Sequence, residues 1–343
     1  GTKASVSYSI GDKTEGVNGS CSPKDLETML QLTYLTFTAP RRDDDAFASY
    51  KNRSKASLQN QELNPSVAFG DSIQATVYNH HPRAIRMKAD MIDQIDYDKL
   101  MEMYKDRYKD ASDFTFILVG NIDIEKDKEL IAEYLGALPA INRKETFKDT
   151  KMEMRKGTYK NEFIRQQETP KASVLVLYNG KCKYDQKNNL LMSMTSQILD
   201  LIYTEKVRED EGGTYGVYVG GNLAKYPKEN AFLQIIFETA PEKKDKLMEI
   251  IFAEAANLAK NGPSEANLNK VKEYMLKKHK EDLKENSYWL GNIDEYLFTG
   301  VDMMKDYENM VNSITTKDIQ KFADELLKQK NEVEVTMVSP EKK

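Results

Sequence analysis

Apolar residues recur along most of the chain at the three- and four-residue spacing of an amphipathic helix. In the first such segment, Ser22 and Pro23 are typical of a helix N-terminus, and Pro40 ends the run. The apolar positions of this segment are Leu26, Met29, Leu30, Tyr34 and Phe37. The pattern predicts a helix that buries one face and leaves the other in solvent.

The same spacing predicts further helices, and the apolar runs between them predict strands. The helices are expected to begin near residues 43, 64, 96, 124, 185, 242, 264, 287 and 315. The strands are expected at residues 113–121, 161–167, 172–180, 214–221, 231–239 and 332–339. Strands that alternate with long amphipathic helices favour an α+β fold, with helices packed on one face of a mostly antiparallel sheet.

A charged stretch with little apolar pattern, residues 142–157, is expected to be a linker. It separates a first domain, residues 1–141, from a second domain, residues 158–343. The length of 343 residues agrees with two domains, because single hydrophobic cores usually stop growing at about 250 to 300 residues.

The apolar pattern also repeats at long range. Similar residues occupy positions whose numbers differ by 221 in the pairs Leu26 and Leu247, Phe47 and Leu268, and Gly70 and Gly291. The offset is 219 in the pairs Ile95 and Ile314, and Phe114 and Val333. We interpret this as a tandem duplication in which the first copy lacks a counterpart of residues 158–221. The first domain is therefore expected to be truncated at its N-terminus, the alternative being a smaller domain that is complete as written.

Composition excludes some classes of function. The chain has 50 basic and 55 acidic residues, so no positive excess is available to neutralise phosphates, and no nucleic acid partner is expected. Its longest apolar run, Val174 to Tyr178, is far shorter than the roughly 20 residues of a membrane span. Cys21 and Cys182 stand singly and form neither a disulfide framework nor a metal-binding cluster.

One junction carries candidate chemistry. The stretch KVREDEGGTYGVYVGG, residues 206–221, places Arg208 at the end of a long helix, Gly212 in a turn and Tyr215 at the start of a strand. On the residues alone, Arg208 could simply interact with the helix C-terminus and Tyr215 could pack as an ordinary strand aromatic. The alternative is that both side chains contact a substrate.

The segments around this junction resemble the pitrilysin/insulinase family of zinc peptidases. The resemblance rests on the Arg-Glu pair, the glycine turn and the tyrosine seven residues after the arginine. It extends to YKDRYKDASDFTFILVGNIDIEKDKELIAEYLGALP, residues 104–139, and to the tail ITTKDIQKFADELLKQKNEVEVTMVSP, residues 314–340. It therefore covers most of the chain.

The resemblance implies a fold and an activity. Family members consist of four homologous α+β domains, arranged in two halves that close like a clam shell around a peptide. The resemblance implies that this chain is the C-terminal half, with a truncated third domain and an intact fourth. It also implies that Arg208 and Tyr215, with Gly212 in the turn between them, contact the substrate backbone and the oxyanion of the reaction.

The chain departs from the family in its metal chemistry. The family's zinc is held by H-x-x-E-H in the first domain, and this chain has no such motif. Its three histidines are His80 and His81, in a loop, and His279, which is expected on a solvated helix. We therefore expect the zinc to lie in an N-terminal partner half, on the same chain or a separate subunit, and this chain alone to be inactive on peptides.

Three functions remain in competition. The first is the substrate-clamping half of a zinc-dependent endopeptidase, and the second is a non-catalytic subunit or scaffold of the same family. The third is a plain peptide-binding module, to which residues 221–239 could offer an edge strand. Tyr288, Trp289 and Leu290 are expected in the core rather than at a site. The resemblance favours the bacterial periplasm or cell envelope, with the cytoplasm as the alternative.

Overall fold

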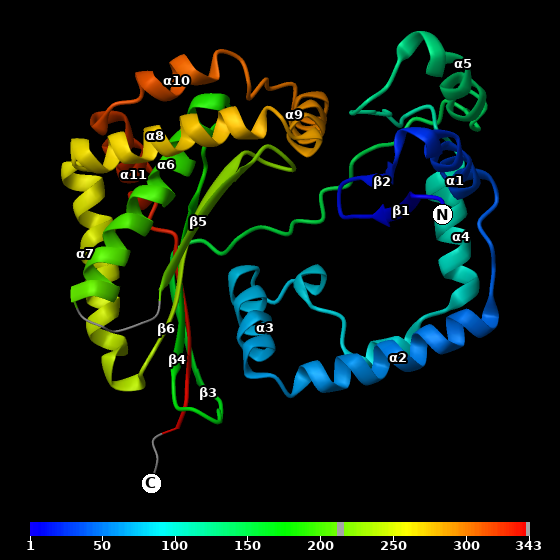
Figure 1. Cartoon of the computed structure of the whole chain (residues 1–343). Coiled ribbons are helices and arrows are strands. Elements are labelled where there is room, and N and C mark those ends of the chain that lie inside the picture. Colours follow the sequence, from blue (N-terminus) through cyan, green and yellow to red (C-terminus); the bar gives the residue numbers. More distant parts are fainter. Residues whose placement is uncertain (211–215, 341–343) are drawn as a thin grey trace. The chain divides into compact units, whose positions relative to one another are not determined.

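The computed structural model describes residues 1–210 and 216–340, and of residues 208–210 only the backbone path. The chain forms two compact units (Figure 1). Unit 1 comprises Gly1–Gln59 and Met87–Lys148, and unit 2 comprises Asn60–Arg86 and Asp149–Lys343. The two units are defined by how the chain packs. The domains predicted from the sequence, residues 1–141 and 158–343, are defined as homologous repeats, and they remain a prediction.

Unit 2 contains a five-stranded sheet. Its spatial order is β3 (Thr158–Ile164), β7 (Glu332–Val338), β4 (Ala172–Gly180), β6 (Asn230–Thr239) and β5 (Val217–Ala224). The β3–β7 pair is parallel, and all other neighbours in this sheet are antiparallel. The predicted α+β class with a mostly antiparallel sheet is confirmed.

Helices cover one face of this sheet, as expected. They are α6 (Gln186–Tyr203), α7 (Lys244–Asn261), α8 (Glu265–Asp282), α9 (Asn286–Thr299), α10 (Tyr307–Ser313) and α11 (Thr316–Leu327). Side chains such as Val174 and Val176 of β4 pack with Ile198 of α6 and Leu247 of α7 in one apolar cluster. Figure 1 shows α6, α7 and α8 on this side of the sheet.

The opposite face of the sheet is covered by helix α3 (Pro65–Val77). The expected arrangement had helices on one face, and α3 adds a second helical layer. Phe69 and Val77 of α3 pack with Leu175 and Leu177 of β4. All nine residues of β4 are buried, because the strand has a helix layer on each face. Asn161 of β3 also donates hydrogen bonds of 2.9 Å to the Ser72 and Thr76 hydroxyls of α3.

Unit 1 has a smaller core. It contains an antiparallel hairpin of β1 (Ala4–Ile10) and β2 (Glu15–Cys21), with α1 (Leu26–Thr38), α4 (Tyr97–Tyr108) and α5 (Ile124–Leu135). Helix α2 (Asp44–Glu62) begins in unit 1 and ends in unit 2. Phe37, Tyr104, Tyr108 and Leu138 form the buried cluster. The Tyr108 hydroxyl lies 2.8 and 2.9 Å from carbonyl oxygens of the two hairpin strands.

The strand expected at residues 113–121 is absent from the described structure, so that prediction is wrong. By the repeat, this segment matches β7, which in unit 2 lies between β3 and β4. Because the repeat gives the first copy no counterparts of β3 and β4, the segment has no neighbouring strand to complete its backbone hydrogen bonds. The β1–β2 hairpin was not predicted.

The order of elements supports the duplication. Asp44 of α2 and Glu265 of α8 differ in number by 221, as do Pro65 of α3 and Asn286 of α9. Tyr97 and Thr316, which begin α4 and α11, differ in number by 219, and these two helices have the same length. Short 3₁₀ turns occupy Pro23–Asp25, Pro82–Ala84, Ala89–Gln94 and Pro241–Lys243.

Helix α9 departs from the core that the sequence predicts. Trp289 and Leu290 are 39% and 40% exposed, so their placement in the core is wrong, whereas Tyr288 is half-buried. Thr299 is the buried residue of this helix. No helix of the described chain is both long enough and apolar enough to span a bilayer.

The packing of α3 on the sheet can be tested with a matched pair of phenylalanines. We expect Phe69→Ala to lower the free energy of unfolding of unit 2 by about 3 to 5 kcal/mol, because it leaves a cavity between α3 and β4. The control Phe147→Ala, at a side chain 65% exposed, should change it by less than about 0.5 kcal/mol. Urea unfolding followed by the fluorescence of Trp289, the single tryptophan, measures both. Equal effects of the two substitutions would contradict the packing.

Candidate functional site

The candidate site predicted from the sequence lies where α6 leads towards β5. Arg208 belongs to the π-helical segment Thr204–Asp210, which continues directly from α6. Gly212 and Tyr215 fall in residues 211–215, outside the described residues. π-Helical turns occur often at functional sites, so this backbone geometry draws attention to the segment without assigning it a role.

The segment is anchored at its start. Tyr203 and Val207 are fully buried, and the Tyr203 hydroxyl donates a 2.9 Å hydrogen bond to the carbonyl oxygen of Ile251 on α7. Burial raises the pKa of Tyr203, so its hydroxyl remains a neutral donor. The Nζ atom of Lys206 lies 3.3 Å from Oε1 of Glu254 on α7. Helix α7 therefore fixes the path of the chain as it approaches Arg208.

The segment that follows, strand β5, is also anchored. Val217 and Val219 are buried, and Gly221 lies against α6. A Cβ atom at Gly221 would come within 2.3 Å of the Met192 sulfur and 2.9 Å of the Ser196 hydroxyl, so a larger residue would require these side chains of α6 to move. The stretch between Val207 and Val217 therefore begins and ends on elements that pack tightly against each other.

The edge strands of this sheet are β3 and β5. The predicted edge, residues 221–239, consists mainly of β6, which lies between β4 and β5. Strand β5 has one neighbour, and its Tyr218 is 58% exposed. An open strand edge thus follows the segment that contains Arg208. It is formed by β5, one strand further out than β6.

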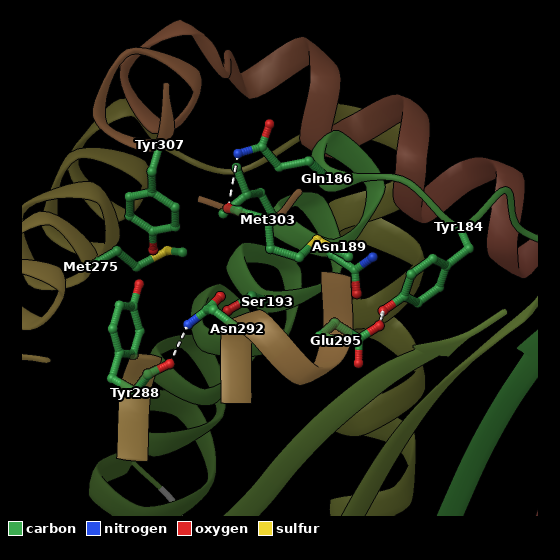
Figure 2. Close-up of a pocket in the computed structure, with 11 residues that line it drawn as sticks. Tyr184, Gln186, Asn189, Ser193, Met275, Tyr288, Asn292, Glu295, Met303 and Tyr307 are labelled. Carbon is green, nitrogen blue, oxygen red and sulfur yellow. Dashed lines mark hydrogen bonds between the residues drawn. The ribbon is translucent and has the colours of Figure 1, made fainter. Parts of the chain in front are cut away.

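A second candidate is a cavity of about 290 Å³ beneath α9 (Figure 2). Its lining comes from α6, α8, α9 and the segments beside them: Tyr184, Gln186, Asn189, Leu190, Ser193, Met275, Tyr288, Asn292, Glu295, Met303 and Tyr307. The Tyr184 hydroxyl donates to Glu295, and the Gln186 amide donates to the Met303 carbonyl at 2.9 Å. Asn292 donates to the carbonyl of Tyr288 at 2.8 Å. Sequence reasoning missed this cavity because its residues form no spaced motif.

His279 lies at the wall of an adjoining cavity and is buried, so its placement on a solvated surface is wrong. Its ring stacks on Tyr307 with centroids 4.3 Å apart, and its Nδ1 shares a 2.9 Å hydrogen bond with the Tyr288 hydroxyl. Burial raises the pKa of Tyr307 to about 12, so this residue is neutral near pH 7. The charged residues around His279 lie on the other faces of α8, and only those faces are solvated.

The histidines do not fit a zinc site. His81 accepts from the backbone N–H of Arg83 at Nδ1 and donates from Nε2 to the carbonyl of Thr150 at 3.0 Å. His279 is bound to Tyr288, and His80 is an exposed loop residue. Among the side chains that the structure describes, those of residues 1–207 and 216–340, no three His, Cys, Asp or Glu are grouped to hold a metal ion.

The described polar groups of the cavities do not form the nucleophile and base of a hydrolase. Ser193 accepts from Gln197 at 3.1 Å, whereas His279 is directed to Tyr288. Cys182 lines neither cavity, and burial raises the pKa of its thiol to about 11, which keeps it protonated at neutral pH. These contacts make the cavities a packing feature of the helical layer.

The link between α8 and α9 gives a direct test of this interpretation. We expect Tyr288→Phe to destabilise the protein by about 1 to 3 kcal/mol, because it leaves the buried Nδ1 of His279 without its partner. Tyr274→Phe, at a neighbouring tyrosine that is 57% exposed, should cost less than about 0.5 kcal/mol. Thermal unfolding of both variants measures the difference, and equal stability would rule out the hydrogen bond as a structural link.

Comparison with known proteins agrees with this architecture. The family profile described as the peptidase M16 inactive domain matches residues 94–275, just over half of the chain. A zinc protease PQQL-like protein of Arabidopsis thaliana is 25% identical over 293 residues, covering 78% of this chain and 30% of the relative. A probable zinc protease PqqL of Haemophilus influenzae is 21% identical over 335 residues, covering 93% and 34%.

Solved structures show the same fold. The crystal structure of the periplasmic protease PqqL from Escherichia coli has a TM-score of 0.83 at 16% identity, covering 98% of this chain and 37% of the other. A peptidase M16 inactive domain from Pseudomonas fluorescens has a TM-score of 0.77 at 21% identity, covering 99% and 82%. The chain spans about a third of the length of the curated relatives it matches. From the profile match, we conclude that the chain belongs to the peptidase M16 family and contains the domain described there as inactive.

Proposed function

We propose that this chain is the C-terminal, substrate-clamping half of a zinc-dependent endopeptidase that encloses peptides between two halves. The observation that carries the proposal is the spacing of Arg208 and Tyr215, seven residues apart, between α6 and β5 in a chain of the M16 family. The described contacts of Tyr203, Val207 and Gly221 support it, because they anchor the segment on both sides. Gly212 is proposed to make the turn between the two side chains.

The two side chains suit the chemistry of peptide hydrolysis. Attack of water on the scissile carbonyl produces a tetrahedral intermediate whose oxygen carries negative charge, and donors already in place stabilise it. The Arg208 guanidinium is permanently charged and presents several N–H donors, and the Tyr215 hydroxyl is a neutral donor. We propose that they donate to this oxygen and to the peptide backbone, while zinc in the other half supplies an activated water molecule.

The partner of this chain is then an N-terminal half that bears H-x-x-E-H, either on the same polypeptide or as a separate subunit. The relatives support this assignment, because their names describe zinc proteases and they are about three times as long as the matched segment. The periplasmic protease PqqL from Escherichia coli supports a location in the bacterial periplasm or envelope. The plant relative keeps other compartments, including the cytoplasm, as the alternative.

A second candidate function is a non-catalytic member of the family. The description of the matched domain as inactive favours it. Both candidates use the same fold, and they differ in whether Arg208 and Tyr215 affect the rate of a reaction.

The two candidates are separated by peptide hydrolysis in the presence of zinc. We expect no cleavage by this chain alone and cleavage by its mixture with a half that bears H-x-x-E-H. In the mixture, Arg208→Ala and Tyr215→Phe should each lower kcat by at least about tenfold, equivalent to about 1.4 kcal/mol of transition-state stabilisation.

Residues of the same type provide matched controls. Lys187→Ala removes a charge at the start of α6 that is engaged with Asp318, away from the end of the helix that leads to Arg208, and it should leave kcat within about twofold. Tyr218→Phe removes the hydroxyl of an exposed tyrosine on β5 and should behave likewise. If the mixture cleaves equally well with Arg208→Ala and Tyr215→Phe, the clamping role is wrong. If no mixture cleaves, the non-catalytic candidate is favoured.

A further inference from the structure

The cavity of about 290 Å³ beneath α9 has one charged side chain in its lining. The lining residues include one acidic side chain, Glu295, and no lysine, arginine or histidine. Glu295 is half-buried, and its Oε1 atom accepts a hydrogen bond from the hydroxyl of Tyr184. Burial and the neighbouring carboxylate raise the pKa of Tyr184, so this hydroxyl stays protonated and remains a donor. The negative charge of Glu295 is therefore not balanced by any side chain of the lining.

Two side-chain amides in the same lining are held so that they offer acceptors. The Nδ2 atom of Asn189 donates to the backbone carbonyl of Asp185 at 2.9 Å, and that of Asn292 donates to the carbonyl of Tyr288 at 2.8 Å. Each bond fixes which end of the amide is the nitrogen and which is the oxygen. In the described part of the chain, neither amide oxygen has a hydrogen-bond donor, so both can accept from a ligand.

The other side of the cavity is apolar and aromatic. Figure 2 shows Met275, Tyr288 and Tyr307 on this side, away from Glu295. The faces of aromatic rings carry partial negative charge and attract cations, and a thioether packs well against aromatic groups. The cavity thus combines an acidic side that is rich in acceptors with an aromatic side, an arrangement typical of small-molecule sites.

We propose that this cavity binds a small primary amine as its ammonium ion, with an attached apolar or aromatic group that lies against Met275, Tyr288 and Tyr307. An ammonium group has three N–H donors and no acceptor, which matches the carboxylate of Glu295 and the amide oxygen of Asn189. Hydrogen bonds between an ammonium group and a carboxylate are stronger than neutral ones. The proposal does not depend on peptidase activity.

Other classes of ligand fit the lining less well. An anion would meet the charge of Glu295 and no basic side chain. In the adjoining cavity, Lys278 is paired with Asp282, and His279 is bound to Tyr288. A divalent metal ion needs several oxygen ligands, whereas Glu295 is the one carboxylate of this lining. A neutral apolar molecule would cover that carboxylate without giving it a donor.

Nuclear magnetic resonance of the 343-residue chain, with isotope-labelled methionine methyl groups, tests the proposal directly. We expect phenethylamine at neutral pH to shift the methyl signals of Met275 and Met303, which line the cavity, in a saturable manner. The signal of Met337, buried on the α3 face of the sheet, should not shift. Phenethyl alcohol and phenylacetate carry the same ring without the positive charge, and each should bind at least about tenfold more weakly.

A pair of neighbouring substitutions on α9 provides a second readout. Glu295→Gln removes the charge but keeps an oxygen that can accept from Tyr184, and it should weaken phenethylamine binding by at least about tenfold. Asp294→Asn, at an exposed residue outside the lining, should leave the affinity within about twofold. The comparison of the three probes on the unsubstituted chain does not depend on how well either variant folds.

Four outcomes would overturn the proposal. One is that phenethylamine causes no saturable shift of Met275 and Met303. Another is that phenethyl alcohol binds as tightly as the amine, which would mean that the cavity recognises the ring alone. A third is that phenylacetate binds more tightly than the amine. The fourth is that Glu295→Gln and Asp294→Asn weaken binding equally, which would assign the effect to surface charge.

Discussion

The burial of strand β4 on both of its faces is the constraint on which the rest of the structure depends. Side chains alternate between the faces of a strand, so Val174 and Val176 require one apolar layer and Leu175 and Leu177 require another. Burial of each such side chain contributes about 1.5 to 3 kcal/mol. Helices α6 and α7 provide the first layer, and α3 provides the second. Because α3 belongs to residues 60–86, residues 158–343 alone leave one face of their sheet open.

The same constraint positions the candidate site. Strands β4, β6 and β5 are neighbours, and β5 lies against α6 at Gly221. The covered sheet therefore fixes both the helix that leads to Arg208 and the strand that follows Tyr215. Donors that stabilise a transition state act best when they are held in place before the reaction, and the packing of α6 and β5 fixes the described residues on either side of the segment. This is the physical link between the fold and the proposed clamp.

Local signals in the sequence predicted much of the fold. Asn64 caps α3 through the N–H of Ser66, and Thr315 and Asp318 form a capping box at the start of α11. The hairpin β1–β2 was missed although Val6, Tyr8 and Ile10 alternate with serines, which is a recognisable strand signal.

For other features the sequence carried too little information. The pattern at 113–121 specifies a strand but not its partners, and the apolar stripes of α3 and α9 look alike although one is buried. The burial of His279 could not be predicted, because it depends on contacts with Tyr288 and Tyr307, which belong to other helices. The roles of Arg208, Gly212 and Tyr215 rest on the family resemblance and stay predictions.

In the proposed function, the segment between α6 and β5 touches the peptide substrate. Its most direct test is photo-crosslinking in the assembled two-half protein, with p-benzoylphenylalanine replacing Tyr215 in one sample and the exposed Tyr218 in a control. A bound peptide is expected to form an adduct with position 215 and not with position 218. A peptide that binds but forms no adduct with position 215 would contradict it.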